Sequence, residues 1–165
     1  MIVVCNSTIL IGLAKIERLE LLKQIFSKIY IPEEVYREVV ERAENRPGAQ
    51  IIREAEWIKT VSVKDKTQVD LLSGTLDRGE AEVLVLAKEL GAELILLDEE
   101  KARRSALIGG FNVMGLLGMF TLAKNLGLIN KVSPLIDELK RKKFRISDRL
   151  VSEILKRVGE EKEIP

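Results

Sequence analysis

The sequence predicts an α/β fold in which a parallel β-sheet is covered by helices on both faces. Short apolar segments rich in β-branched residues alternate with amphipathic segments, and this order is typical of a parallel sheet with helical connections. No internal repeat, low-complexity tract or long linker interrupts the alternation. Because 165 residues are enough to bury one core, we expect a single domain over residues 1–158. A polar C-terminal tail over residues 159–165 should follow, frayed from Glu160.

The expected strands are short, and most have no polar face. Residues 1–5 read M-I-V-V-C and residues 93–97 read E-L-I-L-L, so both fit strands buried within the sheet. In residues 58–63 apolar side chains alternate with polar ones, as in a strand with one exposed face. The full set of predicted strands is 1–5, 29–31, 58–63, 93–97 and 111–113.

The expected helices lie between and after these strands, and capping residues mark several of their ends. Pro32 fits a first helical turn, where Glu33 and Glu34 suit the positive end of the helix dipole. Asp77 begins a strongly amphipathic segment, and Gly91 ends it with a left-handed cap. The full set of predicted helices is 9–14, 17–26, 32–44, 51–55, 65–72, 77–90, 99–108, 115–126, 132–142 and 147–158.

The composition limits the chemistry that the chain can perform. It has 27 basic and 26 acidic residues, so the net charge of +1 argues neither for nor against nucleic-acid binding. There is no histidine, which is the commonest general base, and Cys5 is the only cysteine. A serine or cysteine nucleophile is therefore disfavoured for lack of a base. A hard cation bound by oxygen atoms is favoured over zinc.

Several other classes of protein leave no signal in the chain. The longest apolar runs are too short to cross a bilayer, and no cleavable signal peptide is evident, so we expect a cytoplasmic protein without membrane contact. Neither G-x-G-x-x-G nor G-x-x-x-x-G-K-[ST] occurs, which removes the common nucleotide-binding loops.

Four polar positions follow or adjoin the predicted strands. Asn6 follows the first strand, Glu38 and Glu80 lie in helices, and Asp98 follows strand 93–97. Carboxylates at the carboxyl ends of parallel strands point into the crevice where ligands bind, and they commonly hold Mg²⁺. Each acid also has a structural explanation: Asp98 as a cap of helix 99–108, Glu80 as a first-turn acid, Glu38 as part of a solvated face.

Segments around these four positions resemble the PIN domain family in their order and spacing. The segments are N-S-T-I-L-I, Y-I-P-E-E-V-Y-R-E-V-V, D-R-G-E-A-E-V-L-V-L-A and L-I-L-L-D-E-E-K-A-R-R, and G-L-I-N-K-V-S-P-L-I-D-E-L and F-R-I-S-D-R-L-V extend the likeness to the end. The chain is similar in particular to small prokaryotic PIN proteins described as nucleic-acid-binding. The resemblance implies a three-layer α/β/α fold with a central parallel sheet. It also implies a Mg²⁺- or Mn²⁺-dependent ribonuclease, as in the toxins of VapBC-type toxin–antitoxin pairs.

The resemblance further implies a set of site residues. Asp98, Glu80 and Glu38 would hold the metal ion, and Thr8 would bind a phosphate oxygen or a metal-bound water. Asn6 stands where the family has aspartate, so it offers an amide carbonyl without a negative charge. The implied catalytic set is Asn6, Thr8, Glu38, Glu80 and Asp98, with Glu99 as an additional candidate acid.

Binding of RNA requires positive charge near the site. Lys101, Arg103 and Arg104 follow the strand that ends at Asp98, and we expect them to flank the crevice. A denser basic run over residues 140–145 is better explained as a solvated helix end, where cations suit the negative end of the dipole.

A second functional interpretation follows from Asn6. Loss of the first carboxylate would leave a PIN module without catalysis, which binds RNA or a protein partner. The resemblance implies an antitoxin-like small protein as one such partner. It also implies a homodimer, in which we expect an apolar surface around Leu19 and Leu22 to contact the second copy.

Overall fold

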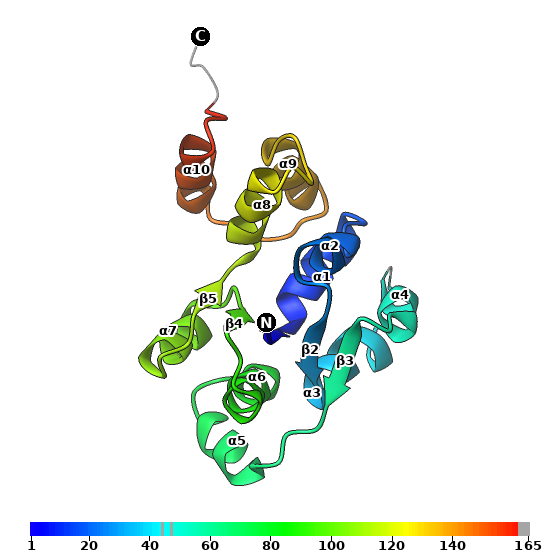
Figure 1. Cartoon of the computed structure of the whole chain (residues 1–165), viewed down its shortest axis with the longest axis vertical. Coiled ribbons are helices and arrows are strands. Elements are labelled where there is room, and N and C mark those ends of the chain that lie inside the picture. The colour runs from blue at the N-terminus through cyan, green and yellow to red at the C-terminus, as the bar shows by residue number, and fades with distance from the viewer. Residues whose placement is uncertain (44, 47, 162–165) are drawn as a thin grey trace.

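The computed structural model describes residues 1–43, 45–46 and 48–161, and it confirms the predicted parallel sheet. Every strand pair is parallel, in the order β3-β2-β1-β4-β5. The strands are β1 (Val3–Cys5), β2 (Ile29–Pro32), β3 (Ile58–Val61), β4 (Leu94–Leu96) and β5 (Val113–Met114). Strand β3 forms one edge and β5 the other (Figure 1). Because all strands run the same way, their carboxyl ends share one edge of the sheet.

Helices cover both faces of the sheet, as the alternating pattern predicts. The helical elements are α1 (Ser7–Lys15), α2 (Glu20–Phe26), α3 (Glu33–Tyr36), the π-helical turn η1 (Arg37–Glu41), α4 (Ala49–Glu54), α5 (Lys66–Leu72), α6 (Arg78–Leu90), α7 (Glu100–Ile108), α8 (Leu116–Asn125), α9 (Ser133–Arg141) and α10 (Asp148–Arg157). Figure 1 shows α1 and α2 on one side of the strands, and α5 and α6 on the other. Among the described residues, no helix combines the length and the apolar character that crossing a bilayer requires.

The strand order contains a switch in direction between β1 and β4. The chain moves outward from β1 to β2 and β3, and then returns across β1 to β4 and β5. The right-handed connections of these two runs lie on opposite faces, so they diverge where β1 meets β4. In open α/β sheets the crevice outside the carboxyl ends of two such strands is the usual ligand site.

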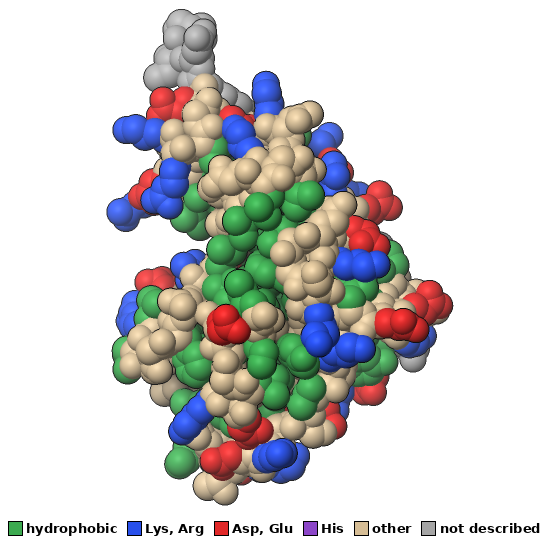
Figure 2. Space-filling model, in the orientation of Figure 1, with side chains coloured by type: hydrophobic (Ala, Val, Ile, Leu, Met, Phe, Trp, Pro, Cys, Tyr) green, Lys and Arg blue, Asp and Glu red, His purple; other side chains and the backbone are tan. Residues whose placement is uncertain are grey.

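The two strands at this switch lie in the centre of the core. All three residues of β1 are fully buried, and Cys5 pairs with Leu96 of β4. Burial raises the pKa of the Cys5 thiol well above its usual value, so this residue is a poor nucleophile, as the sequence indicates. On the face shown in Figure 2, apolar side chains gather across the middle of the molecule, and charged side chains lie mostly around the periphery.

The helix predicted over residues 32–44 is regular only in its first part. Regular α-helical geometry covers Glu33–Tyr36, and η1 follows it, closed by the Arg42 N–H, which donates to the Arg37 carbonyl at 2.7 Å. Apolar spacing does not separate a π-turn from an α-turn, since the two differ by one residue over a single turn. Glu44, the last residue of the prediction, lies outside the described residues.

The predicted dimer surface around Leu19 and Leu22 is wrong. Their side chains are 4% and 0% exposed, and both belong to the core of a single chain, where α2 packs against β2. Helical spacing correctly indicates that these leucines face apolar surroundings. It does not tell whether those surroundings come from the same chain or from a second copy.

Fraying from Glu160 is also wrong. The Glu160 carboxylate accepts hydrogen bonds from the Val132 N–H at 2.9 Å and the Ser133 N–H at 3.0 Å, and pairs with Lys124 Nζ at 2.9 Å. It therefore caps the start of α9 and ties the chain end to α8. The remaining residues of the predicted tail, 162–165, lie outside the described residues.

Replacing Glu160 with alanine is expected to destabilise the fold by about 1.5–3 kcal/mol. The substitution removes a buried carboxylate, so the N–H groups of Val132 and Ser133 lose their acceptor and Lys124 loses its ion pair. Urea unfolding measures the loss. The matched control is Glu161→Ala, at a neighbouring exposed glutamate, which should change the free energy of unfolding little. Equal stability of the two variants would contradict the anchoring role.

Candidate active site

Asn6 lies at the switch between β1 and β4, directly after β1. Its backbone N–H donates to the Leu96 carbonyl at 3.1 Å, and its side chain is almost fully buried. Asn6 Oδ1 accepts from the Ile9 N–H at 3.1 Å, so Asn6 is the N-cap of α1. The amide thus has a structural function that needs no ligand.

Glu38 reaches the same edge from η1. The Ser7 hydroxyl donates to Glu38 Oε2 at 2.8 Å, which joins this carboxylate to the first residue of α1. The other oxygen lies against Gly79, where a Cβ atom would collide with Oε1. Glycine therefore lets the carboxylate approach the first turn of α6. Burial raises the pKa of Glu38, and the nearby Asp77 carboxylate adds to the effect.

Glu80 belongs to a capping box at the start of α6. Asp77 Oδ1 accepts from the Glu80 N–H at 2.8 Å, and Glu80 Oε1 accepts from the Asp77 N–H at 3.1 Å. The prediction that Glu80 acts as a first-turn acid is thus confirmed. The capping box is not the main cause of the raised pKa. Partial burial, reinforced by the negative charges of Asp77 and Glu99, raises the pKa of Glu80 to about 7.

Glu99 is the neighbour with which Glu80 interacts. Although desolvation opposes ionisation, the backbone N–H groups of Ala102 and Lys101 lower the pKa of Glu99, and a hydrogen bond with Glu80 acts in the same direction. The Ala102 N–H donates to Glu99 Oε2 at 2.8 Å, so Glu99 is the N-cap of α7. Near neutral pH the pair therefore holds an ionised Glu99 beside a partly protonated Glu80.

The N-cap of α7 is Glu99, so the alternative prediction that Asp98 caps this helix is wrong. Asp98 Oδ1 instead accepts from the Leu116 N–H at 3.1 Å, at the start of α8. A Cβ atom on Gly115 would lie 2.5 Å from Asp98 Oδ1 and 3.0 Å from an Arg103 guanidinium nitrogen. Burial raises the pKa of Asp98, and the Leu116 N–H and Arg103 only partly offset it.

The predicted site residues thus follow one another along the carboxyl edge of the sheet. Ser7, next to Asn6, contacts Glu38; Glu38 lies against the residue before Glu80; and Glu80 interacts with the residue after Asp98. Thr8 and Asp98 line one cavity of about 200 Å³. Within the described residues, however, no three His, Cys, Asp or Glu side chains lie close enough together to form a ready-made metal cage.

The donor set nevertheless fits a Mg²⁺ or Mn²⁺ ion that keeps most of its water. Such an ion usually takes only one or two protein carboxylates, and it prefers oxygen donors. The carboxyl groups of Glu38, Glu80 and Asp98 all have raised pKa values with burial as the largest cause. A bound cation would lower the energetic cost of ionising them, since it supplies the opposite charge that the site lacks.

The predicted RNA-binding cations differ in their surroundings. Arg103 turns toward Asp98, whereas Arg104 is exposed and pairs with Glu100 at 3.2 Å. Lys101 is exposed at the start of α7. A fourth cation was not expected here: Arg145, from the basic run assigned to a helix end, lines the cavity of Thr8 and Asp98.

Two buried carboxylates near the site have no signal in the sequence. Glu34 is 8% exposed, and it pairs with Arg37 at 2.9 Å and with Arg42 at 2.8 Å. Glu82 accepts from the Glu34 N–H at 3.2 Å. These bonds hold α3 against α6, which fixes η1 relative to the first turn of α6. Both acids stand at ordinary helical positions, and only the fold makes them buried.

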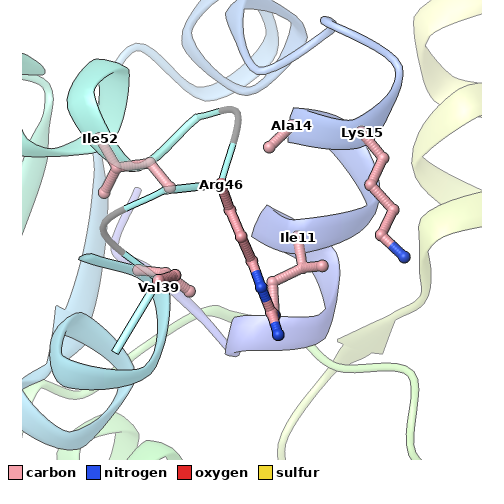
Figure 3. A pocket seen from close by; sticks show the side chains of 7 residues that line it. Ile11, Ala14, Lys15, Val39, Arg46 and Ile52 are labelled. Carbon is pink, nitrogen blue, oxygen red and sulfur yellow. The ribbon is translucent and has the colours of Figure 1, made fainter. Parts of the chain in front are cut away.

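A separate pocket of about 410 Å³ lies between α1 and the segment from η1 to α4 (Figure 3). Apolar side chains, including Ile11 and Val39, form its walls, and the Arg46 side chain runs along it. The Lys15 side chain projects away from the centre of the pocket. No carboxylate lines this pocket among the described residues, so it is distinct from the acidic edge.

Comparison with known proteins gives one informative result. A protein-family model described as PIN domain matches residues 2–160. No curated protein matches the chain. The matched span takes in all five strands of the described sheet and every residue of the acidic edge.

Proposed function

The chain belongs to the PIN domain family, a family of nuclease type whose members generally use divalent metal ions, and we propose that it is a Mg²⁺- or Mn²⁺-dependent ribonuclease. The observation that carries the proposal is the arrangement of three carboxyl groups, Glu38 in η1, Glu80 in α6 and Asp98 after β4, along the carboxyl edge of the sheet at its switch. Burial raises the pKa of each of them. Perturbed carboxyl groups in a crevice are typical of functional sites, since a structural acid gains nothing from being costly to ionise.

Each residue of the site has a proposed task. Asp98, Glu80 and Glu38 would hold the metal ion, which supplies a bound water of lowered pKa and positive charge beside the scissile phosphodiester. Ser7 keeps Glu38 oriented through its hydroxyl group. Thr8, which lines the same cavity as Asp98, would donate a hydrogen bond from its hydroxyl group to a phosphate oxygen. Asn6 Oδ1 would use its second lone pair to bind the metal ion or to orient a metal-bound water, while it continues to accept from the Ile9 N–H and to cap α1.

The proposal extends to the partners of the site. Lys101, Arg103 and Arg104 would bind the RNA backbone, with Arg103 closest to the reaction centre because it faces Asp98. A toxin-type role, with an antitoxin-like small protein as inhibitor, is consistent with a small PIN ribonuclease. A homodimer remains part of the proposal, although its contact surface cannot be the buried Leu19 and Leu22.

A single substitution tests the metal site directly. Asn6→Asp keeps a strong N-cap for α1 and adds a carboxylate oxygen beside the acidic edge. We expect this variant to bind Mn²⁺ about tenfold more tightly and to cleave single-stranded RNA faster than the wild type, because a charged ligand attracts the cation more strongly than an amide does. Calorimetric titration with Mn²⁺ and a gel assay of RNA cleavage measure the two effects.

The control for this experiment is the wild type with EDTA, which should show no cleavage. The substitution Asn112→Asp adds a charge at an exposed position before β5, at the opposite edge of the sheet from Asn6, and it should leave metal affinity unchanged. If Asn6→Asp changes neither metal affinity nor cleavage, Asn6 lies outside the metal site.

A PIN module without catalysis is the second candidate. Two observations favour it: Asn6 already uses its carbonyl as a helix cap, and no ready-made metal cage occurs within the described residues. This candidate predicts a stable fold that binds RNA but neither Mg²⁺ nor Mn²⁺ at millimolar concentration. The same titration therefore separates the two functions.

A further inference from the structure

A short cavity next to Asp98 is closed by a part of the chain far away in sequence. Thr8 and Asp98 line it, and Arg145 and Ser147 contribute from the segment between α9 and α10. Apolar side chains of α8, of the same segment and of α10 complete the walls. The cavity thus combines one carboxylate, two hydroxyl groups, apolar walls and a guanidinium group within about 200 Å³.

The backbone after α9 is shaped to bring this segment to the acidic edge. The Phe144 N–H donates to the Leu139 carbonyl at 2.9 Å, and the Lys143 N–H donates to the Lys140 carbonyl at 3.0 Å, which is a Schellman ending. Its left-handed position, with φ of 60°, is occupied by Lys143 instead of glycine. A lysine in this conformation is strained, so the turn is held by its surroundings.

Phe144 provides part of that hold. A Cβ atom on Gly12 of α1 would lie 3.0 Å from the Phe144 ring and 3.0 Å from Leu116, so the ring packs closely on α1 beside the start of α8. Arg145 follows directly and is exposed. Among the described residues, no carboxylate lies within ion-pair distance of its guanidinium group. Its charge is available to a ligand, which distinguishes it from Arg104 and Arg149, because both of these pair with a glutamate.

We propose that this cavity is a nucleotide subsite of the RNA substrate, with Arg145 as the residue that binds the phosphate next to the one that is cleaved. The inference rests on the proposed ribonuclease function and assigns part of its specificity. The apolar walls fit the face of a base, and the two hydroxyl groups fit its edge or the ribose. Because Asp98 lines the cavity, the subsite is adjacent to the proposed reaction centre. Arg145 therefore positions the substrate and takes no part in the chemical step.

The variant Arg145→Ala tests the subsite. Binding of a fluorescein-labelled single-stranded oligoribonucleotide in EDTA is measured by anisotropy at several salt concentrations. We expect the dissociation constant to rise about tenfold and the slope of log K against log salt to fall by about 0.7, the value for one lost phosphate contact on a single strand. Arg145→Lys should recover most of the affinity, since it keeps the charge.

The matched control is Arg149→Ala, an arginine four residues later whose guanidinium pairs with Glu153 at 3.2 Å. It should bind RNA like the wild type. In the cleavage assay with Mn²⁺, Arg145→Ala should raise KM about tenfold and leave kcat within about twofold, because the lost contact is equally strong in the ground and transition states. Oligonucleotides with one abasic ribose at each position should lose affinity at a position next to the cleaved bond.

The outcomes separate the subsite from the function on which it rests. If the wild type binds and cleaves RNA but Arg145→Ala behaves like Arg149→Ala, the subsite is wrong and the ribonuclease function stands. A fall in kcat without a change in KM also overturns the subsite, as does equal tolerance of an abasic ribose at every position. If the wild type neither binds nor cleaves RNA, the ribonuclease function fails and the subsite fails with it.

Discussion

Replacing Asp98 with asparagine is expected to slow metal-dependent RNA cleavage strongly without destabilising the protein. Asparagine keeps an oxygen that can accept from the Leu116 N–H, so the start of α8 stays capped. The charge that would bind the metal is lost. Since such an interaction is worth several kcal/mol in the transition state, cleavage should fall by about 10²-fold or more.

The stability of this variant distinguishes a functional acid from a structural one. Burial raises the pKa of Asp98, so ionising this carboxyl group costs more free energy in the folded state than in the unfolded state. Removing the charge should therefore leave the melting temperature equal to that of the wild type or raise it. Asp137→Asn, at an exposed position of α9, is the matched control and should retain full cleavage. A marked fall in melting temperature for Asp98→Asn would show that Asp98 serves the fold.

Cleavage is expected to increase as the pH rises through about 7, because Glu80 must lose its proton to bind a cation and its pKa lies near that value. Without metal, the same group makes the fold less stable over this range. The folded state holds the proton more tightly than the unfolded state, so the stabilising contribution is complete below about 4.5 and is lost as the pH rises through about 7.

The variant Glu80→Gln should remove both effects. Glutamine can still accept from the Asp77 N–H, which preserves the capping box, but it neither titrates nor attracts a metal ion. The melting temperature of the wild type in EDTA should decline from pH 5 to pH 8 more steeply than that of the variant, and millimolar Mg²⁺ should reduce the decline. The control is Glu56→Gln, at an exposed position before β3. Identical pH profiles of wild type and Glu80→Gln would rule out an elevated pKa at this position.

The fold was predictable because its signals are local. Buried strands such as β1 and β4 are short apolar runs, and α6 begins with a capping box that can be read from D-R-G-E. The π-turn at η1 was not predictable, since its hydrophobic spacing also fits an α-helix. The prediction that Leu19 and Leu22 form a dimer surface is wrong for a related reason. Periodicity indicates which side chains turn inward but does not identify the surface that covers them.

The candidate site was predictable only in part. The resemblance to a family singles out three acids, Asp98, Glu80 and Glu38. The fold brings them to one edge of the sheet, where Glu38 lies against the residue before Glu80, and Glu80 interacts with the residue after Asp98. Arg145 had no such signal, because its closeness to Asp98 depends on the turn at Lys143 and on packing against Gly12. Contacts between residues so far apart in sequence leave no local pattern.

The central position of β1 has a consequence for the time at which the site appears during synthesis. Strand β1 pairs with β4, whose residues are made about ninety positions later, and the cavity of Asp98 also needs residues 144–150. A growing chain therefore carries Asn6 and Thr8 through about ninety further residues without the carboxylate that completes their site. The proposed RNA-cleaving site can therefore form only after residues 144–150 have been made and have folded beside Asp98.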